Sequence, residues 1–147
     1  MGASDLTVAY LVDNSAWSRF SSAAVPEPRR IEIARAVDGR EVWTSPIFEL
    51  EAGFSAHDAE RHALMMRDFA RLPHAPIDRE AGRRAIALQG QLAQSGHHRL
   101  PPPDLLTMAV AERHGLTVLH YDKDFDVIRE RTDCLAETEW LVPRGSL

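Results

Sequence analysis

Cysteine is almost absent from this sequence, since Cys134 is the only one in 147 residues. No intrachain disulfide can form, and a reducing compartment is the natural setting. The chain also has no apolar run long enough to span a membrane. Its N-terminus lacks the basic and apolar segments of a secretory signal, and Leu6 stands where a myristoylation motif needs Ser or Thr. These absences predict a cytoplasmic protein without membrane association.

Lysine is equally scarce. Lys123 is the only one, so arginine supplies almost all of the positive charge. The formal net charge is −5, which at first argues against a nucleic-acid partner. If four carboxylates surround a divalent cation, however, the rest of the chain is nearly neutral. Because arginine binds phosphate with a bidentate fork, a local basic track is still possible. The overall charge therefore excludes neither class of partner.

The composition is that of one globular domain spanning residues 1–147, with 44% hydrophobic and 27% charged residues. Residues 141–147 contain the string LVPRGS, which matches a protease site often placed beside affinity tags. The same residues also fit the natural end of a last strand that runs through Trp140. No tag follows them, so we favour the natural interpretation and place no function there.

Short apolar segments alternate with helical patterns along the chain. Strands are predicted at residues 7–12, 42–44, near 77, 117–121 and 137–142. Helices are predicted at residues 29–37, 46–53, 55–72 (from a Ser55-x-x-Asp58 capping box), 78–96, 104–114 and 122–131. This alternation predicts an α/β fold, a three-layer sandwich with a mostly parallel central sheet flanked by helices. In such folds ligands bind beyond the carboxyl ends of the strands.

Four acids lie at or near predicted strand-to-helix transitions: Asp13, Glu49, Asp104 and Asp122. These transitions share one edge of a parallel sheet, so the four side chains are expected to converge. Two like charges at ~4 Å repel by roughly 4 kcal/mol at an effective dielectric of about 20. A divalent cation reverses that sign, because hard cations prefer carboxylate oxygens. A bound ion would activate water and neutralise charge on a phosphodiester.

A purely structural interpretation competes with this one. Asp is a favoured helix N-cap, and Asp13, Asp104 and Asp122 all stand where a cap is expected. Glu49 is different, because it comes four residues after Ser45 and is not the third-position partner of a capping box. It also lies in an apolar stretch, where a glutamate needs a reason. Glu51, two residues on, points to another side of the helix and is expected in solvent.

The local sequences around these acids resemble the PIN-domain family, in particular the VapC-like toxins. The matching segments, in order, are Leu11-Val12-Asp13-Asn14-Ser15-Ala16, Glu49-Leu50-Glu51-Ala52-Gly53, Asp104-Leu105-Leu106-Thr107-Met108-Ala109 and Leu119-His120-Tyr121-Asp122-Lys123-Asp124-Phe125. Their separation and the total length also fit. Asn14 stands where Thr is usual, and Leu106-Thr107 replaces a more apolar pair; neither departure touches an acid.

The resemblance implies an acidic pocket that holds one or two Mg²⁺ or Mn²⁺ ions. On it, Asp13 and Asp104 are the principal metal ligands, and Glu49 and Asp122 complete the site directly or through water. Asp124 is an auxiliary ligand. Ser15 matches a hydroxyl that orients a ligand or the scissile phosphate.

The same resemblance implies a metal-dependent endoribonuclease that hydrolyses RNA phosphodiester bonds as the toxin of a toxin–antitoxin pair. It further implies a homodimer and a cognate antitoxin whose tail occupies the active-site groove. Trp17, Phe20 and the helix from Ile31 to Val37 are candidates to line that groove.

Two other classes of function are compatible with parts of this pattern. Phosphoryl transfer through an aspartyl-phosphate also places an Asp after the first strand, but it usually needs a second Asp two residues on, where this chain has Ser15. A non-catalytic PIN-like module that binds RNA or protein would be favoured by loss of one of the four acids, and all four are present. The nuclease is therefore the leading hypothesis.

Overall fold

A four-stranded parallel sheet forms the centre of the computed structural model, which describes residues 8–147. The strands are β1 (Tyr10–Val12), β2 (Val42–Trp43), β3 (Thr117–His120) and β4 (Thr138–Trp140), in the order β2-β1-β3-β4. Tyr10 pairs with both Val42 and Thr117, and Val118 pairs with Thr138. Thr7, the expected start of the first strand, lies outside the described residues.

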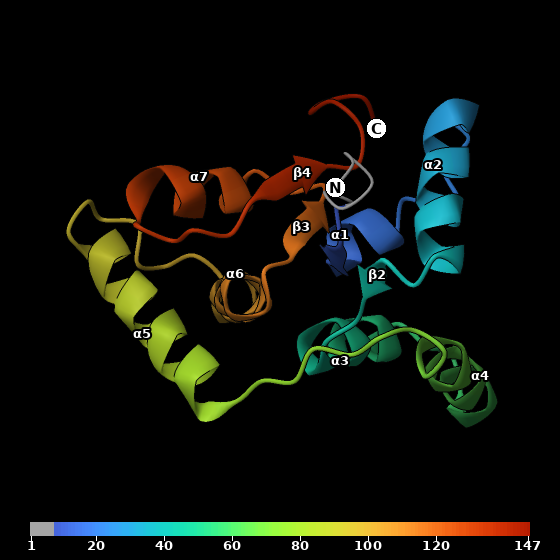
Figure 1. Cartoon of the computed structure of the whole chain (residues 1–147), viewed down its shortest axis with the longest axis horizontal. Helices are drawn as coiled ribbons and strands as arrows, with labels where there is room; N and C mark the ends of the chain where they lie inside the picture. Colours follow the sequence, from blue (N-terminus) through green and yellow to red (C-terminus); the bar gives the residue numbers. More distant parts are fainter. Residues whose placement is uncertain (1–7) are drawn as a thin grey trace, which may run out of the picture.

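Seven helices within residues 8–147 surround the sheet (Figure 1). They are α1 (Asn14–Trp17), α2 (Glu27–Asp38), α3 (Pro46–Phe54), α4 (Ala59–Phe69), α5 (Arg79–Ala93), α6 (Pro102–His114) and α7 (Asp124–Arg131). In Figure 1, α5, α6 and α7 lie to the left of the sheet, and α2 and α4 lie to the right. None of the helices in this part of the chain has both the length and the apolarity of a membrane span.

The side chains of successive strand residues pack into two separate apolar cores. Leu11 and Val118 pack into one core with residues of α5, α6 and α7, such as Met108. Their neighbours Val12 and Leu119 pack into the other core, with residues of α2 and α4. Successive side chains of a strand point to opposite faces, so both faces of the sheet are covered. The predicted three-layer α/β sandwich with a parallel sheet is confirmed.

Some predicted boundaries were wrong. Ser55 does not open a helix: its hydroxyl donates to the Ala52 carbonyl oxygen (2.7 Å) at the end of α3, and Asp58 caps α4 instead. Ile77 forms no strand. The nearest strand-like pairing is an isolated parallel β-bridge between Thr44 and His74. Helix α6 begins at Pro102, so Asp104 lies in the first turn rather than at the N-cap.

The segment after β4 is part of the folded body. Leu141 and Val142 are 1% and 4% exposed and belong to the core that contains α2. The Arg29 Nε group donates to the Leu141 carbonyl oxygen at 2.7 Å. This packing shows that Leu141 and Val142 are part of the folded domain.

Candidate metal centre

Asp13 lies directly after β1, where its carboxylate is held by Ser15. Asp13 is 6% exposed and is the N-cap of α1, so the helix-capping role expected from the sequence is confirmed for this residue. Its Oδ2 atom accepts from the Ser15 N–H (3.0 Å) and from the Ser15 hydroxyl (2.6 Å). The same hydroxyl accepts from the Tyr121 N–H at 2.9 Å. Ser15 therefore ties the ends of β1 and β3 together and fixes the orientation of the Asp13 carboxylate.

Three further acids converge at the same edge of the sheet. One carboxylate oxygen from each of Asp104, Asp122 and Asp124 lies within 4.8 Å of the others. Asp122 follows β3, and its Oδ1 atom accepts from the Asp124 N–H at 2.9 Å. Asp104 is 7% exposed, and its Oδ2 atom is buried without a hydrogen-bond partner in residues 8–147.

The proton affinities of these acids reflect their crowding. Burial raises the pKa of Asp104 to about 8, and the charges of Asp13, Asp122, Asp124 and Glu51 act in the same direction. Burial also raises the pKa of Asp13, assisted by Asp122 and opposed by the bonds from Ser15. The pKa of Asp124 is raised by burial and then by Asp122. Such a cluster is unfavourable unless a cation or protons neutralise it, and its all-oxygen donor set fits a hard divalent cation.

The two glutamates of α3 occupy places opposite to those expected. The Glu49 Oε2 atom lies 3.1 Å from His74 Nδ1, and Glu49 is not among the groups that act most strongly on the pKa of Asp104. Glu51, expected in solvent, has a buried Oε1 atom without a partner in the described chain. Burial, then the charges of Asp13 and Asp122, raise its pKa. The structure thus brings Glu51, and not Glu49, to the acidic cluster.

The helix geometry of α3 explains this exchange. Residues two apart on a helix are about 200° apart around its axis, so only one of the two glutamates can face the cluster. Ile47, Phe48 and Ala52 are the buried residues of α3. Glu51 is four residues from Ile47 and three from Phe48, which places it on that buried face. The signal was present in the sequence, in the phase of the apolar residues.

His120 is a second residue whose position the sequence did not predict. It is fully buried and packs on Phe125 and Trp140. Burial lowers the pKa of its imidazole to about 4, so the ring is neutral near pH 7. Its Nδ1 atom accepts from the Asp122 N–H at 3.1 Å, which supports the turn that carries Asp122 and Asp124.

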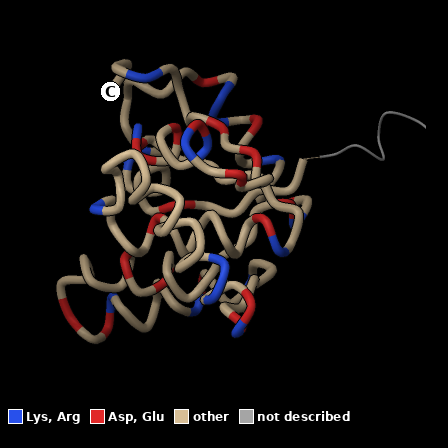
Figure 2. The backbone as a smooth tube through the Cα atoms, turned by 90° about the vertical axis from the view of Figure 1, so that its left-hand side faces the viewer, with Lys and Arg blue, Asp and Glu red and all other residues tan. Residues whose placement is uncertain are grey.

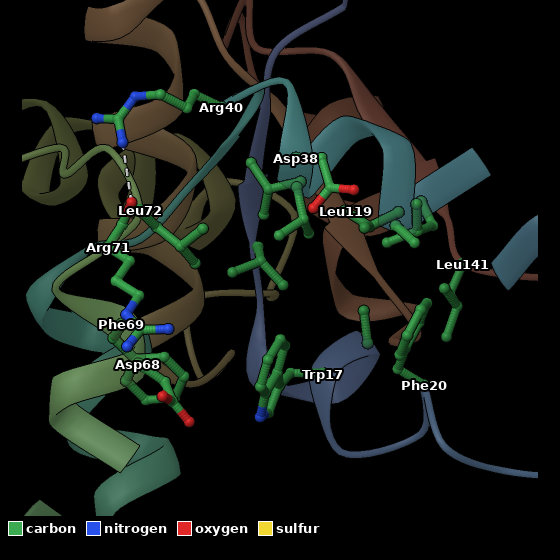
Figure 3. A pocket seen from close by; sticks show the side chains of 16 residues that line it. Trp17, Phe20, Asp38, Arg40, Asp68, Phe69, Arg71, Leu72, Leu119 and Leu141 are labelled. Carbon is green, nitrogen blue, oxygen red and sulfur yellow. Dashed lines mark hydrogen bonds between the residues drawn. The ribbon is translucent and has the colours of Figure 1, made fainter. Parts of the chain in front are cut away.

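A separate apolar cavity of about 620 Å³ lies between α1, α2 and the end of α4. Figure 3 shows the Trp17, Phe69 and Leu72 side chains around it, and Arg40 with Arg71 at one edge. The other candidates for the antitoxin groove are placed mostly here: Phe20, Ile33, Ala34 and Val37 line this cavity, whereas Ile31 lines a different and smaller one.

Comparison with known proteins agrees with this geometry. The model of the PIN domain matches residues 10–131. Ribonuclease VapC51 of Mycobacterium tuberculosis is 32% identical over 97% of this chain and 99% of its own length. Ribonuclease VapC2 of the same species is 40% identical over 84% of this chain and 86% of its own length.

The fold is also similar to solved structures. The DNA-bound VapBC structure from Salmonella typhimurium superposes with a TM-score of 0.71 at 18% identity, covering 92% of this chain and 100% of that one. VapBC-5 from Mycobacterium tuberculosis gives 0.59 at 24% identity, covering 91% and 98%. The matching family model, the relatives and the acidic site together lead to one conclusion: the chain belongs to the PIN-domain family and, within it, to the VapC ribonucleases.

Proposed function

We propose that this protein is a metal-dependent endoribonuclease that hydrolyses RNA phosphodiester bonds as the toxin of a toxin–antitoxin pair. The observation that carries the proposal is the convergence of five carboxylates, two of which have buried oxygens without a hydrogen-bond partner in residues 8–147. The five are Asp13, Glu51, Asp104, Asp122 and Asp124. The names of the relatives, which are ribonucleases, supply the substrate class.

Mg²⁺ or Mn²⁺ is the ion that this donor set suits, since both prefer carboxylate oxygen and water. Asp13, Asp104 and Asp122 are the proposed principal ligands, with Asp124 auxiliary. Glu51 takes the part that the sequence assigned to Glu49. When bound, the ion supplies an activated water molecule and neutralises charge on the scissile phosphodiester.

The chain's own residues prepare this site in two ways. Ser15 holds Asp13 in one orientation, and His120 supports the turn that carries Asp122. Asp104, whose pKa is raised to about 8, carries a proton at neutral pH when no cation is present. Cation binding displaces that proton, so metal affinity increases as the pH rises towards 8.

Two partner proteins are proposed as well. The apolar cavity between α1, α2 and α4 is the proposed binding place for an apolar segment of the cognate antitoxin, which Arg40 and Arg71 would flank. A second copy of this chain is the other partner. Leu50 and Phe54, one turn apart on α3, are 75% and 93% exposed and are proposed to be covered in the homodimer.

The test uses purified protein free of antitoxin, end-labelled total RNA, and Mg²⁺ or Mn²⁺, in parallel with chelator. Asp104→Asn removes the central carboxylate, and Asp68→Asn, an exposed position on α4, is the matched control. Discrete cuts that require metal, are lost in Asp104→Asn and persist in Asp68→Asn support the proposal. Cleavage that survives chelator or Asp104→Asn contradicts it. A folded protein that binds metal but cuts no RNA would be the non-catalytic module instead.

A further inference from the structure

A second, smaller cavity of about 350 Å³ adjoins the acidic cluster on the side of the C-terminal segment. It shares Asp122 and Ser15 with the metal centre. Its other side chains are of two kinds, cationic and aromatic: Arg19, Lys123, Arg144, Tyr121 and Trp140. The cavity therefore places three positive charges and two aromatic rings beside the carboxylates.

This concentration of positive charge is local. Figure 2 shows acidic and basic residues interspersed along the chain rather than gathered on one basic face. Several arginines elsewhere are neutralised by a carboxylate, as Arg84 is by Glu112. Arg19, Lys123 and Arg144 have no carboxylate oxygen within 4.0 Å in residues 8–147. Their charges are available to a ligand.

Arg19 is positioned before any ligand arrives. Its Nη1 atom donates to the Ser15 carbonyl oxygen at 3.0 Å. Its guanidinium carbon lies 5.1 Å from the centre of the Tyr121 ring, in a cation–π contact. The remaining N–H groups of the guanidinium have the fork geometry that suits a phosphate.

Tyr121 also anchors the segment that carries Arg144. The Tyr121 hydroxyl accepts from the Gly145 N–H (3.0 Å) and from the Leu147 N–H (2.9 Å). The Tyr121 ring in turn packs edge-on against Trp140, with ring centres 5.4 Å apart. Residues 143–147 are thereby held over the cavity, and Arg144 is brought to the same opening as Arg19.

We infer that this cavity binds the RNA phosphate next to the one that is cut, with the attached nucleoside against Tyr121 and Trp140. Asp122 both lines the cavity and belongs to the acidic cluster, so a phosphate in the cavity lies directly beside a phosphate at the metal centre. Arg19 and Arg144 bind the phosphate, Lys123 adds charge, and the aromatic rings supply the flat apolar surface on which nucleosides stack. The inference rests on the proposed ribonuclease function.

The test measures binding apart from cleavage. All variants carry Asp104→Asn and are kept in chelator, and the probe is short, fluorescein-labelled, random-sequence single-stranded RNA followed by anisotropy at several salt concentrations. Arg19→Ala and Arg144→Ala are each expected to weaken binding roughly tenfold. Each is also expected to make the plot of the logarithm of the binding constant against the logarithm of the salt concentration less steep. The slope should change by about 0.7 for every phosphate that the variant no longer binds. Arg61→Ala, which removes another exposed charge on α4, is expected to change neither.

Tyr121→Phe separates anchoring from charge. It keeps the ring and all three cations but removes the hydroxyl that holds the C-terminal segment. We expect it to weaken RNA binding as Arg144→Ala does, and to add little in an Arg144→Ala background, because both changes act through the same residue. Thermal melting of each variant confirms that the fold is retained.

The outcomes distinguish this inference from the proposed function. Wild-type affinity and salt dependence in both Arg19→Ala and Arg144→Ala overturn the inference, even if the wild-type protein cuts RNA. Loss of RNA affinity in these two variants, in a protein that cuts no RNA, leaves the binding site in place and overturns the hydrolytic function instead. With the Asp104 carboxylate restored, in Mg²⁺, the arginine variants are expected to raise KM for a cleaved RNA roughly tenfold.

Discussion

Asp104 is the residue whose replacement should change the protein most, and in two opposite directions. Its carboxyl group has a pKa raised from 3.8 to about 8, by burial first and then by the neighbouring acids. Asp104→Asn replaces it with a neutral group of nearly the same shape. Without metal, the variant is expected to be more stable than the wild-type protein. With metal, it is expected to lose the stabilisation that the cation provides.

The raised pKa of Asp104 means that its ionisation destabilises the metal-free folded protein. A carboxyl group with a higher pKa in the folded state destabilises that state once the pH is high enough to ionise the unfolded chain. For Asp104 the effect is absent below about pH 4, grows between about pH 4 and 8, and is complete above about pH 8. The free energy of unfolding of the metal-free wild-type protein should therefore fall across this window.

The size of the pKa change sets an upper limit on this destabilisation. Each pKa unit corresponds to about 1.4 kcal/mol, so the rise of the Asp104 pKa from 3.8 to about 8 is worth at most roughly 6 kcal/mol. Structural relaxation and water penetration lower the effective penalty at such a buried site, which we take as about 2–3 kcal/mol. Against this, a cation at about 100 times its Kd stabilises the wild-type protein by roughly 2.7 kcal/mol. The two effects are similar in size and opposite in sign.

The assay is urea denaturation at pH 5 and pH 8, in chelator and in Mg²⁺, for the wild-type protein, Asp104→Asn and the control Asp68→Asn. In chelator at pH 8, the free energy of unfolding of Asp104→Asn should be about 2–3 kcal/mol higher than that of the wild-type protein. At pH 5 this difference in the free energy of unfolding should be smaller. Mg²⁺ should stabilise the wild-type protein and Asp68→Asn but not Asp104→Asn. Equal stabilities of the three proteins in chelator at pH 8 would refute the reasoning.

Three further predictions concern other residues. Glu51→Gln should weaken Mg²⁺ binding at least tenfold by calorimetry, whereas Glu49→Gln, whose carboxylate faces His74, should leave it unchanged; the reverse pattern would return Glu49 to the site. Ser15→Ala removes the hydroxyl between Asp13 and the Tyr121 N–H, so it should destabilise the fold by about 1–3 kcal/mol in urea titration and lower cleavage more than Ser15→Thr does. Phe54→Glu should shift the protein from dimer to monomer in light scattering without lowering the melting temperature, because this side chain is 93% exposed; an unchanged mass would exclude this face of α3 from the dimer.

Much of the fold was predictable from local patterns. The apolar runs that end at Asp13 and Asp122, and the proline that follows Ser45, predicted β1, β3 and α3 close to their observed bounds. The errors fell where two local signals compete. Ser55 and Asp58 are both good caps, and only the packing of α3 decided that Ser55 ends one helix while Asp58 begins the next.

Within the site, the sequence by itself determined the kinds of residue present: acids after β1 and β3 and near the start of α6, which a parallel sheet must bring to one edge. The phase of Ile47 and Phe48 in the sequence favours Glu51 as the glutamate of α3 that joins them. The tertiary structure made the choice final, because rotation of that helix is set by what these two side chains pack against. The cationic cavity was likewise decided in three dimensions. Arg19 and Arg144 are far apart in the chain, and both are positioned by Tyr121. Its ring contacts the Arg19 guanidinium, and its hydroxyl accepts hydrogen bonds from the backbone N–H groups of Gly145 and Leu147, which leave no mark on the sequence.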